Sequence, residues 1–168
     1  MNKMRFVLPV FFIITLAACS KPVAHVEPQV ITAGTSCSLD GMTLADFPGP
    51  KGQIHYVTGS PDFFCDTLEM FSIYLQPEQK KNITGIFTQN MGKTDWESPK
   101  DNWIDAKQAF YVLGSKKTGS MGPTLAAFAL LEDADAFTKQ FGGKVLYFDQ
   151  VTLAMVDLTG GVVSDEHM

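Results

Sequence analysis

Two stretches, Tyr56-Val57-Thr58-Gly59-Ser60 and Tyr111-Val112-Leu113-Gly114-Ser115, repeat one pattern along the chain. Each begins with aromatic and β-branched residues, which favour a strand, and ends with glycine and serine, which favour a turn. A helical pattern follows each strand, and a further strand follows each helix. The sequence therefore predicts two related strand–helix–strand units that share one core, which is an α+β fold.

The spacing of apolar residues places the helices of these units. A first helix is expected over residues 63–75, with Asp62 as its N-cap and Pro77 beyond its end. A second is expected from Asp133, as N-cap, to Phe141, because two glycines follow it. The pattern Thr-Leu-x-x-Phe occurs at Thr67–Phe71 and again at Thr124–Phe128. This repeat aligns the second stretch with the first helix. The other expected strands lie at 83–88 and 145–148.

The first eighteen residues predict an export signal. Lys3 and Arg5 precede an apolar run over residues 6–16 that is too short to span a bilayer. Leu16-Ala17-Ala18-Cys19 then resembles the lipobox of bacterial lipoproteins. We therefore expect residues 1–18 to be removed and Cys19 to carry the lipid anchor. Ser20, which follows the cysteine, favours the periplasmic face of the outer membrane.

Composition and turn residues divide the mature chain. With 168 residues, of which 45% are hydrophobic, the sequence suits a single domain. Its net charge of −5 argues against a nucleic-acid partner. Residues 19–33 are expected to form the lipidated terminus and a tether, residues 34–160 the domain, and residues 161–168 a flexible tail.

Soft sulfur ligands stand in two loops. Ser36-Cys37-Ser38-Leu39-Asp40-Gly41-Met42 combines a thiol and a thioether, and Gly41 lets the backbone turn back between them. Such donors favour Cu(I), whereas zinc seldom uses a thioether. Met121 lies among polar and glycine residues, so no apolar pattern accounts for it, and it is a candidate for another soft ligand.

Six motifs stand in order along the chain: Cys37-Ser-Leu-Asp-Gly-Met42, Gly49-Pro50-Lys51-Gly52-Gln53-Ile54, Gln89-Asn90-Met91-Gly92-Lys93, Trp103-Ile104-Asp105-Ala106, Gly119-Ser120-Met121-Gly122 and Phe141-Gly142-Gly143. Together they resemble the NosL family, the accessory lipoproteins of nitrous-oxide reductase. The resemblance implies a periplasmic Cu(I) chaperone, anchored to the outer membrane, that helps to build the copper centres of apo nitrous-oxide reductase. It also implies two ββαβ-like modules similar to those of the organomercurial lyase MerB.

The resemblance also implies a ligand set. Cys37 matches the copper-binding cysteine, Met121 matches a methionine proposed as a ligand, and Met42 occupies a sulfur position near the cysteine. Many members have a histidine where this chain has Phe47, which excludes an imidazole ligand there. His55 is a less favoured substitute for that histidine, and His25 and His167 fall in the expected tether and tail.

The residues leave other interpretations open. Cys65 matches no family position and is expected to be a small buried residue, so that Cys37 would be the thiol ligand. In an oxidising compartment, however, Cys37 and Cys65 could instead form the disulfide of a structural lipoprotein. A thiol-based or organometal-processing enzyme related to organomercurial lyase is the remaining alternative. A Cu(I) site with few sulfurs could also be shared by two chains in a copper-bridged homodimer.

Overall fold

The computed structural model describes residues 26–79 and 82–158. The predicted signal peptide, the lipidation site Cys19, His25 and the tail with His167 lie outside these residues. Within the two described ranges, no helix combines the length and the apolar character needed to cross a membrane.

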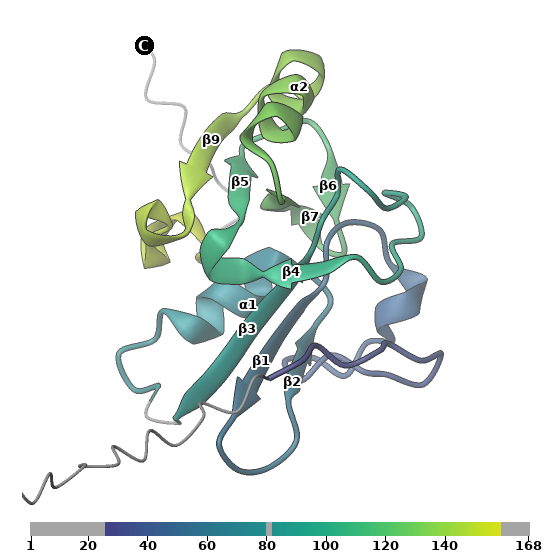
Figure 1. The fold of residues 1–168 in the computed structure, drawn as a ribbon, viewed down its shortest axis with the longest axis vertical. Coiled ribbons are helices and arrows are strands. Elements are labelled where there is room, and N and C mark those ends of the chain that lie inside the picture. Colours follow the sequence, from purple (N-terminus) through teal and green to yellow (C-terminus); the bar gives the residue numbers. More distant parts are fainter. Residues whose placement is uncertain (1–25, 80–81, 159–168) are drawn as a thin grey trace, which may run out of the picture.

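The first module is a sheet backed by one helix. Its central strand, β1, pairs antiparallel with β2 on one side and with β3 on the other, and β4 extends the sheet beyond β3. Helix α1 crosses behind β1 and β3 in Figure 1. The elements are η1 (Leu44–Asp46), β1 (Gly52–Tyr56), β2 (Asp62–Phe64), α1 (Thr67–Tyr74), β3 (Ile83–Gln89), β4 (Trp103–Asp105) and η2 (Ala106–Gln108).

The second module repeats this order. Its first strand, β5, is again central, between β8 and β9, and α2 packs at the upper end of the molecule (Figure 1). A short hairpin, β6–β7, is inserted between β5 and β8. The elements are β5 (Phe110–Leu113), β6 (Thr118–Gly119), β7 (Gly122–Pro123), β8 (Ala126–Phe128), α2 (Leu131–Phe141), β9 (Lys144–Tyr147), η3 (Phe148–Gln150) and η4 (Leu153–Met155). The prediction of two related ββαβ-like modules in one α+β domain is confirmed.

The predicted start of the first helix is wrong. Asp62 lies in β2, because residues 62–64 pair with β1. The helix begins at Thr67, and its N-cap is Asp66, whose Oδ1 accepts a hydrogen bond from Leu68 N at 2.8 Å. The repeat at Thr124 is also misaligned, since residues 126–128 form a strand and not a helix.

The second helix stops where the glycines predict. It ends at Phe141, and Gly142 follows it with a φ of 76°, a conformation that favours glycine. It begins at Leu131, however, so Asp133 lies inside its first turn and does not cap it. Favourable interaction of acidic side chains with the helix N-terminus explains why this residue type is found there.

The main core joins the two modules. Tyr111, on the central strand of the second module, is completely buried and packs edge-on against Phe71 of α1, with ring centroids 5.0 Å apart. Its hydroxyl donates a hydrogen bond of 2.7 Å to the carbonyl of Ala106, which precedes β5. Apolar residues from both modules surround this pair, including Ile54, Phe64, Met70, Ile86, Leu125, Ala127 and Leu146.

Removing the Tyr111 hydroxyl should destabilise the fold measurably. We expect Tyr111→Phe to lower the free energy of unfolding by about 1–2 kcal/mol, because the Ala106 carbonyl loses its buried donor. The matched change Tyr147→Phe, on a side chain that is 52% exposed, should alter it by less than about 0.5 kcal/mol. Urea denaturation of the purified protein measures both values. Equal effects would show that the Tyr111 hydroxyl contributes nothing specific.

Candidate metal centre

The loop that carries Cys37 closes on itself. An isolated bridge joins Ser36 to Thr43, and Cys37 N donates to the Met42 carbonyl at 2.8 Å. Gly41 turns the chain with a φ of 79° and donates back to the Cys37 carbonyl at 2.9 Å. The loop therefore holds Cys37 inward, where its side chain is only 4% exposed, and the Met42 side chain packs against the same small core.

Two residues next to the start of α1 meet Cys37. One ligand atom from each of Cys37, Cys65 and Glu69 lies within 4.8 Å of the other two, and all three residues are buried. Cys37 Sγ shares a hydrogen bond of 3.3 Å with Glu69 Oε2, and Cys65 Sγ donates to the Met42 carbonyl at 3.7 Å. Both cysteines are free thiols. This arrangement can hold one metal ion.

The two thiols differ in their acidity. The neighbouring thiol of Cys65 lowers the pKa of Cys37 to about 6, against the opposing effect of burial. The interaction with Cys37, together with burial, raises the pKa of Cys65 far above its ordinary value. Burial and the charge of Cys37 raise the pKa of Glu69 to about 8. The negative charge of this group therefore lies preferentially on the Cys37 sulfur, whereas Cys65 and Glu69 hold their protons more tightly.

A buried lysine ties the surrounding backbone together. Lys51 is 1% exposed, and its Nζ donates to the carbonyls of Phe47, Pro48 and Cys65 at 2.8, 2.9 and 3.0 Å. Burial lowers the pKa of Lys51 to about 8, whereas the nearby Asp66, Cys65, Glu69 and Cys37 oppose this shift. The ammonium group therefore places one positive charge beside the acidic group formed by the thiols and Glu69.

The N-cap of α1 fixes the hairpin of the second module. The buried carboxylate of Asp66 accepts a hydrogen bond of 2.6 Å from the Thr124 hydroxyl, which follows β7. Gly119 lies so close that a Cβ there would be 1.8 Å from Asp66 Oδ2. The β6–β7 hairpin therefore packs against Asp66, the residue that follows Cys65. Met121, in the turn of this hairpin, is 64% exposed.

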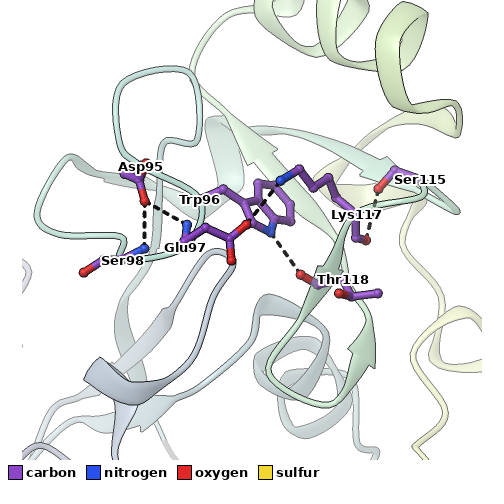
Figure 2. Close-up of polar contacts among 7 residues, drawn as sticks. All are labelled: Asp95, Trp96, Glu97, Ser98, Ser115, Lys117 and Thr118. Atoms are coloured by element: carbon purple, nitrogen blue, oxygen red, sulfur yellow. Dashed lines mark hydrogen bonds and ion pairs between the residues drawn. The ribbon is translucent and has the colours of Figure 1, made fainter.

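Figure 2 shows how Trp96, from the loop between β3 and β4, holds the β6–β7 hairpin. Trp96 Nε1 donates to the Thr118 carbonyl at 3.0 Å, and the Trp96 carbonyl accepts from Gly49 N at 2.8 Å. The Lys117 ammonium lies 5.4 Å from the centroid of the indole and 3.3 Å from Glu97 Oε1. Trp96 therefore links the turn before Lys51 to the strand that leads to Met121.

The remaining candidates fall in different places. Phe47 packs beside Met42 against the core of Cys37, Leu44 and Cys65, so the position without a histidine does border the site. His55 faces another environment. Its Nε2 lies 2.9 Å from Gln53 Oε1, and its ring packs edge-on against Phe87 at 5.3 Å. The structure brings Cys37 and Met42 together and leaves His55 in a separate hydrogen-bonded group.

Sequence reasoning missed three residues around Cys37 and gave a fourth, Cys65, no part in the copper site. Cys65 is buried, as expected, and it lies against Cys37 as a free thiol, whereas only the disulfide alternative had brought these two cysteines together. Glu69, Lys51 and Asp66 had no role in the prediction. One signal was available, because Asp66 stands three residues before Glu69, a spacing typical of a helix N-terminus. A helix capped by Asp66 would have placed Glu69 in its first turn and Cys65 directly before its N-cap, at the same end of the helix.

This chain is similar to a protein-family model and to several known proteins. A family model described as NosL matches residues 28–156. The copper-binding lipoprotein NosL of Stutzerimonas stutzeri is 40% identical over 131 residues, which cover 77% of this chain and 68% of that protein. The protein of the same name from Achromobacter cycloclastes is 38% identical over 162 residues, covering 92% and 83%. The crystal structure of the copper chaperone NosL from Shewanella denitrificans superposes with a TM-score of 0.73 at 38% identity, covering 76% of this chain and 97% of that one.

Removing the Lys51 ammonium should loosen the centre. We expect Lys51→Met to lower the free energy of unfolding by at least about 2 kcal/mol, because three carbonyls lose a common buried donor. Lys93→Met, a matched change on an exposed side chain, should have an effect below about 0.5 kcal/mol. Chemical denaturation of both variants provides the measurement. A Lys51→Met protein as stable as the unsubstituted one would show that the three hydrogen bonds do not hold the loop.

Proposed function

This chain belongs to the NosL family, and on that premise we propose that it is a lipid-anchored periplasmic Cu(I) chaperone that delivers copper to apo nitrous-oxide reductase. The names of its relatives, copper-binding lipoprotein and copper chaperone, support copper as the cargo and lipid as the anchor. The lipobox ending at Cys19, followed by Ser20, supports attachment to the outer membrane. The proposal assigns binding and transfer of an ion, without catalytic turnover.

One observation carries the choice of Cu(I). The Cys37 thiol is held inward by a closed loop, and the Met42 thioether packs against the same cluster. An anionic soft donor with a neutral soft donor is a set that selects Cu(I) over hard cations. The thiolate supplies most of the affinity. The neutral thioether completes the coordination without adding charge, which suits an ion that must later leave.

Met121 is proposed as the ligand that faces the recipient. Its side chain is exposed, yet Asp66 and Trp96 fix the hairpin that carries it. The Met121 side chain can rotate on this fixed hairpin to bind an ion held by Cys37. Because the side chain is exposed, a ligand of the acceptor protein can then displace its sulfur from the ion. His55 is not needed for this role, because Gln53 and Phe87 hold its ring elsewhere.

Copper transfer tests the function as a whole. Protein loaded with one equivalent of Cu(I) should raise the copper content of apo nitrous-oxide reductase, measured by mass spectrometry after the two are separated. Cys37→Ser should abolish tight binding and transfer together, because it removes the anionic soft donor. Normal loading of the reductase by Cys37→Ser protein would contradict the proposal.

The role of Met121 has its own test. We expect Met121→Leu, which preserves volume and apolar character, to leave the free energy of unfolding unchanged and to weaken Cu(I) binding at least about tenfold. Met155→Leu, on another exposed methionine, is the matched control and should change neither quantity. Competition with a Cu(I) chelator gives both affinities. The losses from Cys37→Ser and Met121→Leu should not add, since ligands of one ion are coupled. Additive losses would place Met121 outside the site.

A further inference from the structure

Cys65 lies in the group of donors that surrounds Cys37, although no family motif in this chain includes it. It directly precedes the N-cap of α1, and its side chain is completely buried. A thiolate sulfur lies about 2.3 Å from a bound soft or borderline metal, so two thiolates on opposite sides of one ion are about 4.6 Å apart. The donor atoms of Cys37, Cys65 and Glu69 lie within 4.8 Å of one another. This upper limit admits one ion bound by both sulfurs.

A second observation points to an occupant at this place. Glu69 is 2% exposed, and its Oε1 is a buried oxygen for which the described part of the chain supplies no hydrogen-bond donor. Its other oxygen is already engaged with Cys37 Sγ. Buried polar atoms are nearly always satisfied, because an unsatisfied one costs free energy. The unpartnered oxygen of Glu69, a residue that lies beside both thiols, indicates that this place binds a further ion or molecule.

The charges are also suited to two thiolates. Burying two thiolates with one monovalent cation leaves a net charge of −1, which is costly unless it is compensated. Lys51 provides the compensating charge, since its buried Nζ donates to the Cys65 carbonyl at 3.0 Å. Helix α1 begins next to Cys65, and the positive end of its dipole favours negative charge there.

We propose that Cys65 is a second thiolate ligand, so that Cys37 and Cys65 together hold Cu(I) and Glu69 positions Cys37 through its hydrogen bond. This inference rests on the proposed copper function and adds a donor to it. On binding, the S–H bond of Cys65 is broken and two S–Cu bonds are formed, one of them to the Cys37 thiolate. The Cys65 proton passes to the buffer, and neither sulfur nor the copper changes oxidation state.

Substitution of Cys65 tests the assignment. Cys65→Ser should weaken Cu(I) binding by more than about 100-fold, beyond the 10- to 100-fold range typical of residues that only orient a ligand. Ser72→Ala is the matched control. Ser72 is buried in α1, one turn after Glu69, and its hydroxyl donates a hydrogen bond to the Glu69 carbonyl. The control should stay within about threefold of the unsubstituted protein. Affinities come from competition with a Cu(I) chelator, and circular dichroism verifies folding.

A second measurement keeps the inference testable if Cys65→Ser does not fold. In the variant Met42→Leu/Met121→Leu, Cys37 and Cys65 are the remaining sulfur donors of the centre. X-ray absorption at the copper edge should still count two sulfurs, and a count of one would overturn the assignment of Cys65. Unchanged affinity in Cys65→Ser would also overturn it, while tight binding by the unsubstituted protein would leave the proposed function intact. Failure of the unsubstituted protein to bind Cu(I) would overturn both.

Discussion

A single buried ammonium group holds the parts of the centre in place. Lys51 Nζ binds three carbonyls that belong to the turn before β1 and to Cys65. Its own backbone is bonded to Gln89 at the end of β3. A charge without water is tolerated inside a protein only where several acceptors surround it. The turn, the central strand and the start of α1 must therefore adopt one relative position, and that position brings Cys65 to Cys37.

The centre belongs to the first module and lies beside a contact with the second. Both modules place their first strand in the middle of a sheet and return to it through a helix. The second module differs by the β6–β7 hairpin, and this insertion is seated on Asp66, the N-cap of the first module's helix. Thr67 also donates to the Leu125 carbonyl, so two hydroxyl contacts join the modules beside the thiols. A metal ligand on the hairpin would therefore be positioned by the same contacts that hold the domain together.

The sequence predicted the features that depend on local pattern. The central strands, the end of α2 at Gly142 and the two-module order all follow from side-chain period and turn residues. The start of α1 was misplaced because the prediction used Asp62 as its N-cap, and only pairing with β1 assigns Asp62 to a strand. Strand β4 was missed because its pairing with β3 is a long-range contact.

The centre was predicted only in part, for a similar reason. Cys37 and Met42 share one short loop, so their spacing could be interpreted directly. The role of Cys65 depends on how that loop lies against β2, where Ser38 N bonds to the Phe63 carbonyl at 2.7 Å. Glu69 and Lys51 had no role in the prediction. Their burial arises from packing between distant segments, which no local pattern encodes.

The most direct test of this account is the position of the ion itself. A crystal structure of the Cu(I)-loaded protein, with anomalous differences collected on both sides of the copper absorption edge, would locate it. The account predicts one copper peak between Cys37 Sγ and Cys65 Sγ, next to Glu69 and covered by the hairpin that carries Met121. A copper peak at His55, or one bound to Cys37 with Cys65 turned away, would contradict it.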